Sequence, residues 1–266
     1  MEKLVYTNGI YQTGDQPISF FAKAFPSFTF YLKFLRLVFK ASVRAKGFQY
    51  DGDEWSQSSF DVLRALENVG VCIEIRGIDH LRRLEEPCVF IANHMSMLET
   101  VVLPAIIQPV KDVTFVVKQS LLDYPIFKHI MRSRDPIAVS RKHPRDDFKA
   151  VLEGGVERLH AGRSIIIFPQ TTRTPSFDPA RFNTIGIKLA RKARVPVVPI
   201  GLLSDAWGNG KYIKDFGKID PSKNVFFAFG EPLRIQGHGN EEHAEILEFI
   251  RRSIYSARPP FSIDNT

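Results

Sequence analysis

A histidine and a carboxylate lie close together where the apolar run 88–92 ends. His94 follows this run directly after Asn93, and Glu99 comes five residues after His94. In one continuous helix this spacing would turn the two side chains about 140° apart, because a helix has 3.6 residues per turn. We therefore expect His94 in a turn after a strand and Glu99 in the first turn of the next helix. Glu99 can then accept the Nδ1–H of the imidazole and leave Nε2 to take a proton from a hydroxyl group.

The same segment also fits a purely structural motif. Ser96-Met97-Leu98-Glu99 has the pattern of a capping box, in which Ser96 is the N-cap and Glu99 bonds back to its amide. The residues of this segment alone leave both interpretations open.

Three further segments follow in order along the chain. Residues 135–141 have the pattern of a short strand that ends in Arg141, and residues 168–173, Phe-Pro-Gln-Thr-Thr-Arg, end in Arg173. Residues 195–201 form the run Val-Pro-Val-Val-Pro-Ile-Gly. Together with Asn93-His94 and Glu99, these segments resemble the four ordered motifs of the glycerolipid acyltransferases, the family of 1-acylglycerol-3-phosphate acyltransferases. The first of these motifs is NH-x4-D, the third is usually FPEGTR, and the resemblance covers roughly residues 70–232.

The resemblance implies transfer of a fatty acyl group from a thioester, acyl-CoA or acyl carrier protein, to the free hydroxyl of a lysophospholipid. It implies that His94 is the general base and that Glu99 orients it. It also implies that Arg141 and Arg173 bind the acceptor phosphate, which suits the geometry of a guanidinium group. Further substrate contacts are expected from Asn93, Gln170, Thr171 and Thr172. We expect no metal ion and no other cofactor.

Two motif positions differ from the family pattern. Glu99 stands where the first motif has aspartate, and Gln170 and Thr171 stand where the third motif has Glu-Gly. The loss of a carboxylate makes the pocket more positive, and the loss of glycine removes backbone freedom. An acceptor other than lysophosphatidic acid therefore remains open, and so does a protein that only binds anionic lipid. Arg141 has Lys142 and Arg145 nearby, which is also the pattern of a solvated surface.

A basic and aromatic stretch precedes these motifs. No acidic residue occurs between Asp15 and Asp51. At 100° per residue one helical sector carries Lys33, Arg36, Lys40 and Arg44, and another carries Phe28, Tyr31, Leu32, Leu35, Phe39 and Val43. This pattern predicts a basic amphipathic helix that docks on an anionic membrane surface. An ordinary core helix with a solvated basic face is the alternative. The longest charge-free run, residues 24–32, is shorter than the roughly 20 apolar residues of a spanning helix.

After this stretch, strand and helix patterns alternate. Strands are expected at residues 71–75, 88–92, 113–117, 137–139, 164–168, 195–200 and 225–229, and helices at 98–107, 120–131, 146–160, 183–193 and 241–255. This order predicts an α/β fold with a mixed sheet flanked by helices. Residues 47–59, rich in Gly, Asp, Ser and Gln, have the composition of a loop. We therefore divide the chain into a membrane-association segment with its linker, 1–59, and an acyltransferase domain, 60–266.

Composition excludes several classes of protein. With 44% hydrophobic and 24% charged residues, the chain has the composition of a globular protein, and its two cysteines exclude a disulfide-dense scaffold. The defining glycine motifs of serine hydrolases, dinucleotide enzymes and P-loop proteins do not occur. A net charge of +7 favours polyanionic partners, but no nucleic-acid-binding fingerprint accompanies it. Because the first residues lack the pattern of a signal peptide, we expect a peripheral protein on the cytoplasmic face of a membrane.

Overall fold

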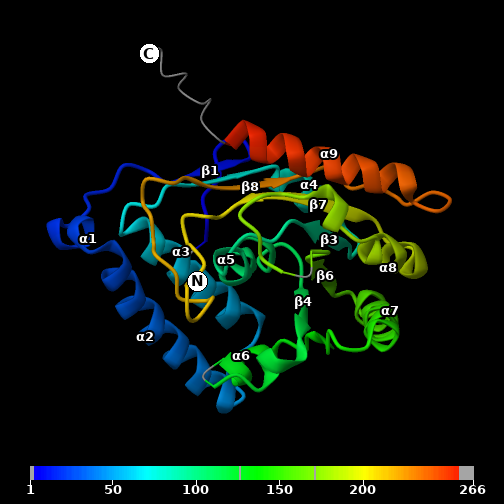
Figure 1. Ribbon diagram of the computed structural model, residues 1–266, viewed down its shortest axis with the longest axis horizontal. Coiled ribbons are helices and arrows are strands. Elements are labelled where there is room, and N and C mark those ends of the chain that lie inside the picture. Colours follow the sequence, from blue (N-terminus) through cyan, green and yellow to red (C-terminus); the bar gives the residue numbers. More distant parts are fainter. Residues whose placement is uncertain (1–2, 126, 171, 258–266) are drawn as a thin grey trace.

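A mixed sheet runs through the centre of the molecule (Figure 1). The computed structural model describes residues 3–125, 127–170 and 172–257, and in this part of the chain the sheet has eight strands in the order β1-β2-β8-β7-β3-β6-β4-β5. The strands are β1 (Ile10–Gln12), β2 (Ile73–Arg76), β3 (Val89–Ala92), β4 (Val113–Lys118), β5 (Ile137–Val139), β6 (Ser164–Ile167), β7 (Val197–Leu203) and β8 (Val225–Phe229). The β1–β2 and β7–β8 pairs are antiparallel and the other pairs are parallel. The prediction of an α/β fold with a mixed sheet is confirmed.

Helices cover both faces of this sheet. The bounds of the helices are α1 (Phe20–Ala24), α2 (Pro26–Lys46), α3 (Gly52–Glu67), α4 (Ile78–Arg83), α5 (Leu98–Ile107), α6 (Phe127–Ser133), α7 (Pro144–His160), α8 (Ile185–Ala193) and α9 (Asn240–Ala257). Short 3-10 turns lie at Gln119–Leu122 and Pro179–Arg181. Buried side chains of α2, α3 and α5 form one core with the sheet, and those of α7, α8 and α9 form a second core on the opposite face.

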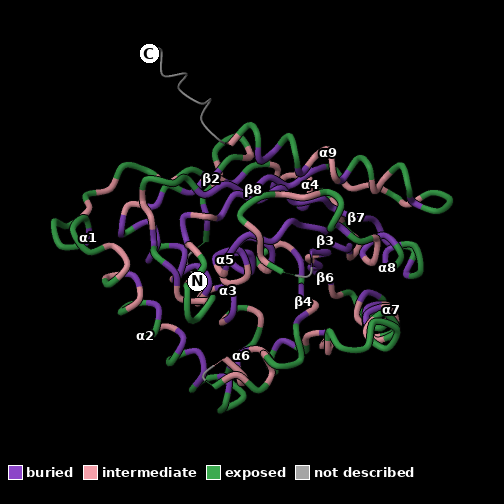
Figure 2. Tube along the Cα trace, in the orientation of Figure 1, coloured by how far each residue is buried: buried purple, intermediate pink, exposed green. Residues whose placement is uncertain are grey.

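Strand β3 shows why the sheet must be covered on both sides. Phe90 and Ala92 belong to the first core, whereas Val89 and Ile91 belong to the second. Successive side chains of a strand point to opposite faces, so a strand that is apolar at every position needs a partner on each face. Figure 2 shows the central strands as mostly buried and α1 as mostly exposed.

The parallel strands place the predicted motifs at one edge of the sheet. β3, β4, β5, β6 and β7 run in the same direction, so their carboxyl ends meet at this edge. In open α/β sheets, ligands bind outside the carboxyl ends of the strands. The turns after β3, β5 and β6 carry His94, Arg141 and Arg173 of the first three motif segments, so the fold gathers these residues at the usual position of a ligand site. The fourth segment, residues 195–201, leads into β7 and forms most of it.

The strand predictions hold better than the predictions of loops. Each of the seven expected strands is present within a few residues, whereas β1, α3 and α4 were not expected. The loop expected at residues 47–59 is wrong, because α3 begins at Gly52. The Asp51 carboxylate accepts a hydrogen bond from the Glu54 amide at 2.9 Å and caps this helix. Ser56 and Ser59 of this helix are buried. Residues whose composition is typical of a loop therefore belong to a packed helix. The single helix expected at 120–131 is instead the 3-10 turn Gln119–Leu122 followed by α6.

The basic aromatic stretch forms α1 and α2, with Pro26 at the first position of α2. The face of α2 that packs into the core carries Phe30, Phe34, Val38, Ala41 and Ala45. The predicted apolar stripe lies mostly on a different face: Phe28, Leu32, Leu35, Phe39 and Val43 are between 44% and 66% exposed, whereas Tyr31 is partly buried and packs against the core. The alternative of an ordinary core helix therefore holds for Tyr31 and for the buried face of α2, but not for the other five residues of the stripe. No helix in the described residues is both long and apolar enough to cross a membrane. The division at residue 59 stays a prediction, although β1 joins the common sheet.

Candidate active site

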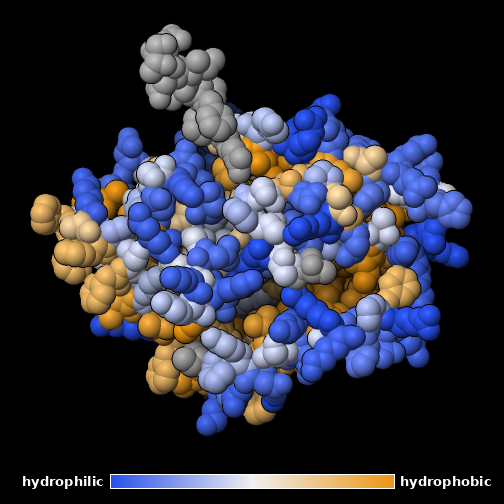
Figure 3. Space-filling view, in the orientation of Figure 1, coloured by the Kyte–Doolittle hydropathy of each residue, from blue (hydrophilic) through white to orange (hydrophobic). Residues whose placement is uncertain are grey.

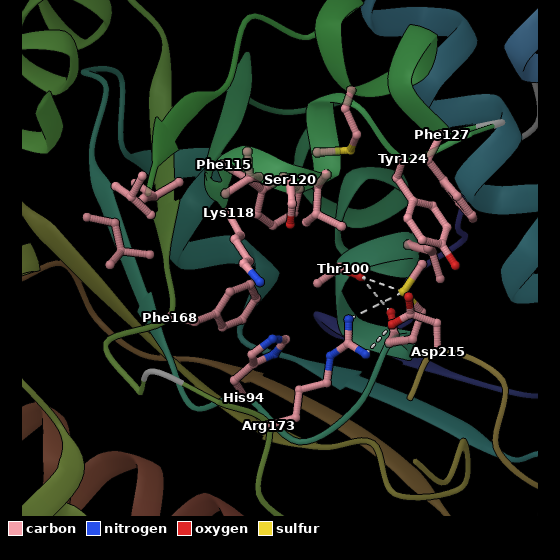
Figure 4. Close-up of a pocket in the computed structure, with 18 of the residues that line it drawn as sticks. His94, Thr100, Phe115, Lys118, Ser120, Tyr124, Phe127, Phe168, Arg173 and Asp215 are labelled. Atoms are coloured by element: carbon pink, nitrogen blue, oxygen red, sulfur yellow. Dashed lines mark hydrogen bonds and ion pairs between the residues drawn. The ribbon is translucent and has the colours of Figure 1, made fainter. Parts of the chain in front are cut away.

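His94 lies in the turn after β3, and its ring is held on two sides. Its Nδ1 atom lies 2.9 Å from Glu99 Oε1, and the ring stacks on Phe168 with centroids 4.3 Å apart and planes inclined by 18°. Figure 4 shows the two rings side by side at the cavity wall. Because Glu99 engages Nδ1, Nε2 is the nitrogen that can take a proton. The predicted arrangement of His94 in the turn and Glu99 in the first turn of α5 is confirmed.

The Glu99 carboxylate is fully buried and surrounded by donors. Oε1 also accepts hydrogen bonds from the amides of Met95 at 2.6 Å and Ser96 at 2.9 Å, and Oε2 accepts one from Ser204 Oγ at 2.5 Å. Burial alone would raise the pKa of this carboxyl. The hydrogen bonds from His94, Ser204 and the Ser96 backbone outweigh burial and hold the pKa well below its usual range. Glu99 therefore stays ionised and fixes the orientation of the imidazole.

The Glu99 carboxylate takes part in helix capping as well as in orienting His94. Glu99 accepts the Ser96 amide as a capping box requires, but the residue at the N-cap of α5 is Met97 rather than Ser96. Ser96 Oγ accepts instead from the Leu98 amide at 3.0 Å. One carboxylate thus both caps the N-terminal end of α5 and orients His94.

Asn93 was predicted to contact substrate, and this prediction is wrong. Its side chain is 1% exposed, donates to the Leu202 carbonyl at 2.9 Å and accepts from the Leu202 amide at 2.8 Å. An amide side chain has the same donor and acceptor as a peptide group, so Asn93 extends the pairing of β3 with β7 beyond Ala92. Asn93 therefore fixes the start of the turn that carries His94.

Gln170 lines the cavity and also supports the same turn. Its Oε1 atom accepts from the His94 amide at 2.8 Å, and its Nε2 atom donates to Thr174 Oγ1 at 2.9 Å. A carbonyl oxygen can accept the His94 amide as a carboxylate oxygen would, so the change from glutamate to Gln170 keeps this bond. Thr172 is exposed and lies on the cavity rim. Thr171, also predicted to contact substrate, lies outside the described residues.

A cavity of about 800 Å³ opens beside His94. Its apolar part extends between α2, α3 and α6, where it is lined by side chains that include Phe34, Val38, Trp55, Val62 and Ile130. Cavities of 300–1,000 Å³ hold ligands of small-molecule size. The space beside the imidazole is therefore large enough for an apolar chain.

The two predicted arginines line the same cavity, and the part of it that they line is here called the arginine end. Arg141 follows β5 and Arg173 follows β6, and both line the wall. Burial, and then the positive charge of Arg173, lower the pKa of Arg141. Lys118, at the end of β4, extends into the same cavity (Figure 4). This arginine end is suited to a bound anion.

Three residues of the site were not predicted from the sequence. Ser204 follows β7 directly, and a hydroxyl residue at the carboxyl end of an apolar strand was a usable signal. Phe168 was part of the third motif, but no role was assigned to it. Asp215, which pairs with Arg173, lies in the irregular segment between β7 and β8 and gave no sequence signal. Among the described residues no cluster of side chains suited to a metal ion occurs.

Comparisons with known proteins agree with the predicted family. A family model described as Acyltransferase matches residues 72–203. The 1-acyl-sn-glycerol-3-phosphate acyltransferase of Pseudomonas aeruginosa is 30% identical over 177 residues, which are 66% of this chain and 65% of that protein. A probable 1-acyl-sn-glycerol-3-phosphate acyltransferase of Mycoplasma genitalium is 30% identical over 185 residues, 66% of this chain and 68% of that protein. The chain thus spans slightly less than two thirds of the Pseudomonas protein.

A solved structure has the same fold. The 1-acyl-sn-glycerophosphate acyltransferase from Thermotoga maritima superposes with a TM-score of 0.64 over 89% of this chain and 97% of that chain. The two sequences are 20% identical, so this similarity concerns the fold alone.

Proposed function

The chain belongs to the glycerolipid acyltransferase family of 1-acyl-sn-glycerol-3-phosphate acyltransferases, and on this premise we propose that it acylates the free hydroxyl of a lysophospholipid. The observation that carries this proposal is the contact of His94 Nδ1 with the buried Glu99, at the wall of a cavity that has an apolar and an arginine end. Acyl-CoA or an acyl carrier protein is the proposed donor, because a thioester needs only a deprotonated hydroxyl beside it.

The proposed reaction uses one proton carrier. His94 Nε2 takes the hydroxyl proton as the acceptor oxygen attacks the thioester carbonyl carbon. The carbon–sulfur bond then breaks, and the leaving thiolate takes the proton back from the imidazolium, so the products are an ester and a free thiol. Glu99 stabilises the imidazolium between these two steps. General-base catalysis of this kind contributes about 100-fold to 10,000-fold to a rate.

We propose that the arginine end holds the phosphate of the acceptor. Arg141 and Arg173 come from two different strand ends, and guanidinium groups match phosphate oxygens with paired hydrogen bonds. The apolar end beneath α2, α3 and α6 then takes a fatty chain. This assignment puts the acceptor hydroxyl near His94, which lines the same cavity as the two arginines.

We further propose that α1 and α2 hold the protein on an anionic membrane surface. Figure 3 shows hydrophobic side chains gathered over these helices. Phe20, Phe28 and Phe39 are 89%, 60% and 66% exposed, and Lys33, Arg36, Lys40 and Arg44 lie on an adjacent exposed sector. The cytoplasmic leaflet, which is rich in anionic lipids, attracts such a basic segment with about 1 kcal/mol per cation near the surface. Phe34 and Val38 on another face of α2 line the cavity, so one helix borders both the proposed membrane surface and the acyl site.

The direct test measures release of free thiol and formation of acylated lipid with a panel of lysophospholipids. Acyl-CoA and acyl carrier protein are compared as donors. We expect the wild type to be active and His94→Ala to lose at least about 100-fold in turnover, with an unchanged melting temperature. Unchanged turnover in this variant would refute the proposed base. Lipid binding without thiol release in the wild type would instead indicate a binding protein, and salt-sensitive binding to DNA but not to vesicles would indicate a nucleic-acid-binding protein.

A further inference from the structure

The arginine end of the cavity contains a carboxylate that the proposed chemistry does not use. Asp215 Oδ1 pairs with Arg173 Nη1, and the two side chains are only 21% and 16% exposed. The second terminal nitrogen of Arg173, Nη2, lies 3.5 Å from the Met97 sulfur. Figure 4 shows Arg173 and Asp215 facing each other across the cavity wall.

The backbone around Asp215 is fixed to the core. The Trp207 indole donates to the Asp215 carbonyl at 3.1 Å. Trp207 is fully buried and packs edge to face on Phe30 and Phe34 of α2, with centroids 4.8 and 5.1 Å apart. These contacts give the Asp215 carboxylate a defined position, although it lies in an irregular segment.

The same segment is also tied to α2 and to the histidine turn. Tyr31 Oη donates to the Gly217 carbonyl at 2.5 Å, and the Ile219 amide donates to Ser27 Oγ at 3.0 Å. Asn209 Nδ2 donates to the Met95 carbonyl at 3.1 Å. Residues 204–219 therefore form a strap that links α2 to the active site.

The negative charge of the Asp215 carboxylate can stabilise the positive charges at the arginine end. Arg141 and Arg173 carry like charges and line the same cavity, and the third motif has the neutral Gln170 where the family motif has glutamate. An acidic partner offsets the repulsion and holds a flexible guanidinium in one orientation. Asp215 provides this partner from a segment far along the chain.

We propose that Asp215 is a positioning residue that sets specificity for a phosphorylated acceptor. It bonds one terminal nitrogen of Arg173 and directs the rest of the guanidinium toward the acceptor phosphate. This inference rests on the proposed acyl transfer, because it assigns the arginine end of the same site.

The test compares two acceptors that differ only in the phosphate, a lysophosphatidate and the monoacylglycerol with the same acyl chain. For Asp215→Asn we expect KM for the lysophosphatidate to rise about 10-fold, since the amide oxygen can still accept a hydrogen bond from Arg173 but the negative charge that strengthens this bond is lost. Turnover at saturation and the kinetics with the monoacylglycerol stay unchanged. Asp215→Glu restores part of the loss. Asp205→Asn is the matched control, because Asp205 lies in the same strap but pairs with Lys223 on the surface.

Three results would overturn this role. A lower KM in Asp215→Asn would mean that the carboxylate competes with the acceptor for Arg173. An equal loss with both acceptors, or a lower melting temperature with an unaltered KM ratio, would indicate a structural role alone. Titration calorimetry with a short-chain lysophosphatidate measures the same difference without turnover. If the wild type transfers no acyl group, the proposed function fails, and the calorimetric ratio of wild type to Asp215→Asn still decides the role of Asp215.

Discussion

The histidine turn and the outer face of α2 are built on opposite principles. In the turn, the Glu99 carboxylate is fully buried and accepts hydrogen bonds from His94, Met95, Ser96 and Ser204. On α2, Phe28, Leu32, Leu35, Phe39 and Val43 are exposed beside a sector of cations. Both oxygens of the Glu99 carboxylate already have partners within the protein, so this part of the turn needs no ligand. The α2 face instead has the exposed apolar area that marks an interaction surface.

Because of this difference, substitutions in the two regions should have different effects. A change in the turn removes a partner from a buried polar group and alters chemistry or stability. A change on the α2 face removes nothing that the fold uses, so it should alter only attachment to a surface. Variants in the two regions can therefore test each proposal without disturbing the other.

The largest effect is expected from Glu99→Gln. An amide in place of the carboxylate presents an NH₂ group to donors and no longer stabilises an imidazolium, so turnover should fall by at least about 100-fold. The measurement is thiol release at saturating substrate, with circular dichroism to confirm the fold. Vesicle binding should stay at the wild-type level. Turnover within a few fold of the wild type would assign Glu99 to capping alone.

The next effect is expected from the double variant Leu35→Glu and Phe39→Glu. Full burial of each apolar side chain is worth about 1.5–3 kcal/mol, so binding to anionic vesicles should weaken about 100-fold or more. The melting temperature and the activity on acceptors dispersed in detergent should not change. Tyr255→Glu is the matched control, since Tyr255 is 75% exposed but lies on α9, away from α2 (Figure 1). Unchanged vesicle binding in the double variant would refute docking through this face.

The sequence predicts the two regions to different extents. His94 and Glu99 could be paired because they lie five residues apart across a strand end, where a local pattern determines geometry. The stripe on α2 could be located by its period, but sequence alone could not decide which face is buried. Phe30, Phe34 and Val38 are as apolar as the exposed residues, and only the packing of α2 against α3 and α6 selects them.

Contacts between distant segments account for what the sequence did not predict. Asn93 and Leu202 are 109 residues apart, and Arg173 and Asp215 are 42 apart. No local period or motif couples such positions, since the order of strands in the sheet brings them together. The prediction of a loop at 47–59 was wrong for a related reason. The serine-rich residues from Gly52 onward form a helix because they pack against α5.

A smaller effect, on stability rather than on binding, is expected from Asn93→Ala. The substitution leaves the amide and carbonyl of Leu202 buried without their side-chain partner, which costs about 1–3 kcal/mol. Denaturant unfolding measures this loss. Asn68→Ala, at the exposed end of α3, serves as control and should change stability by no more than about 0.5 kcal/mol. If the two variants were equally stable, Asn93 would not hold the turn.

The smallest expected effect is a change of stability with pH, which the histidine turn should show and the outer face of α2 should not. Glu99 ionises in the folded protein at a pH below its ordinary pKa of 4.5, so the unfolded chain takes up a proton first as the pH falls. The stabilisation from the ionised carboxylate is thus fully present above pH 4.5 and is lost as the pH falls toward the folded pKa. The difference in unfolding free energy between the wild type and Glu99→Gln should accordingly shrink from pH 7 to pH 3, whereas the difference for Asn68→Ala should not depend on pH. A constant difference for Glu99→Gln would mean that the hydrogen bonds around the carboxylate do not favour its ionised form, and the turn would then lack the fixed negative charge that distinguishes it from the α2 face.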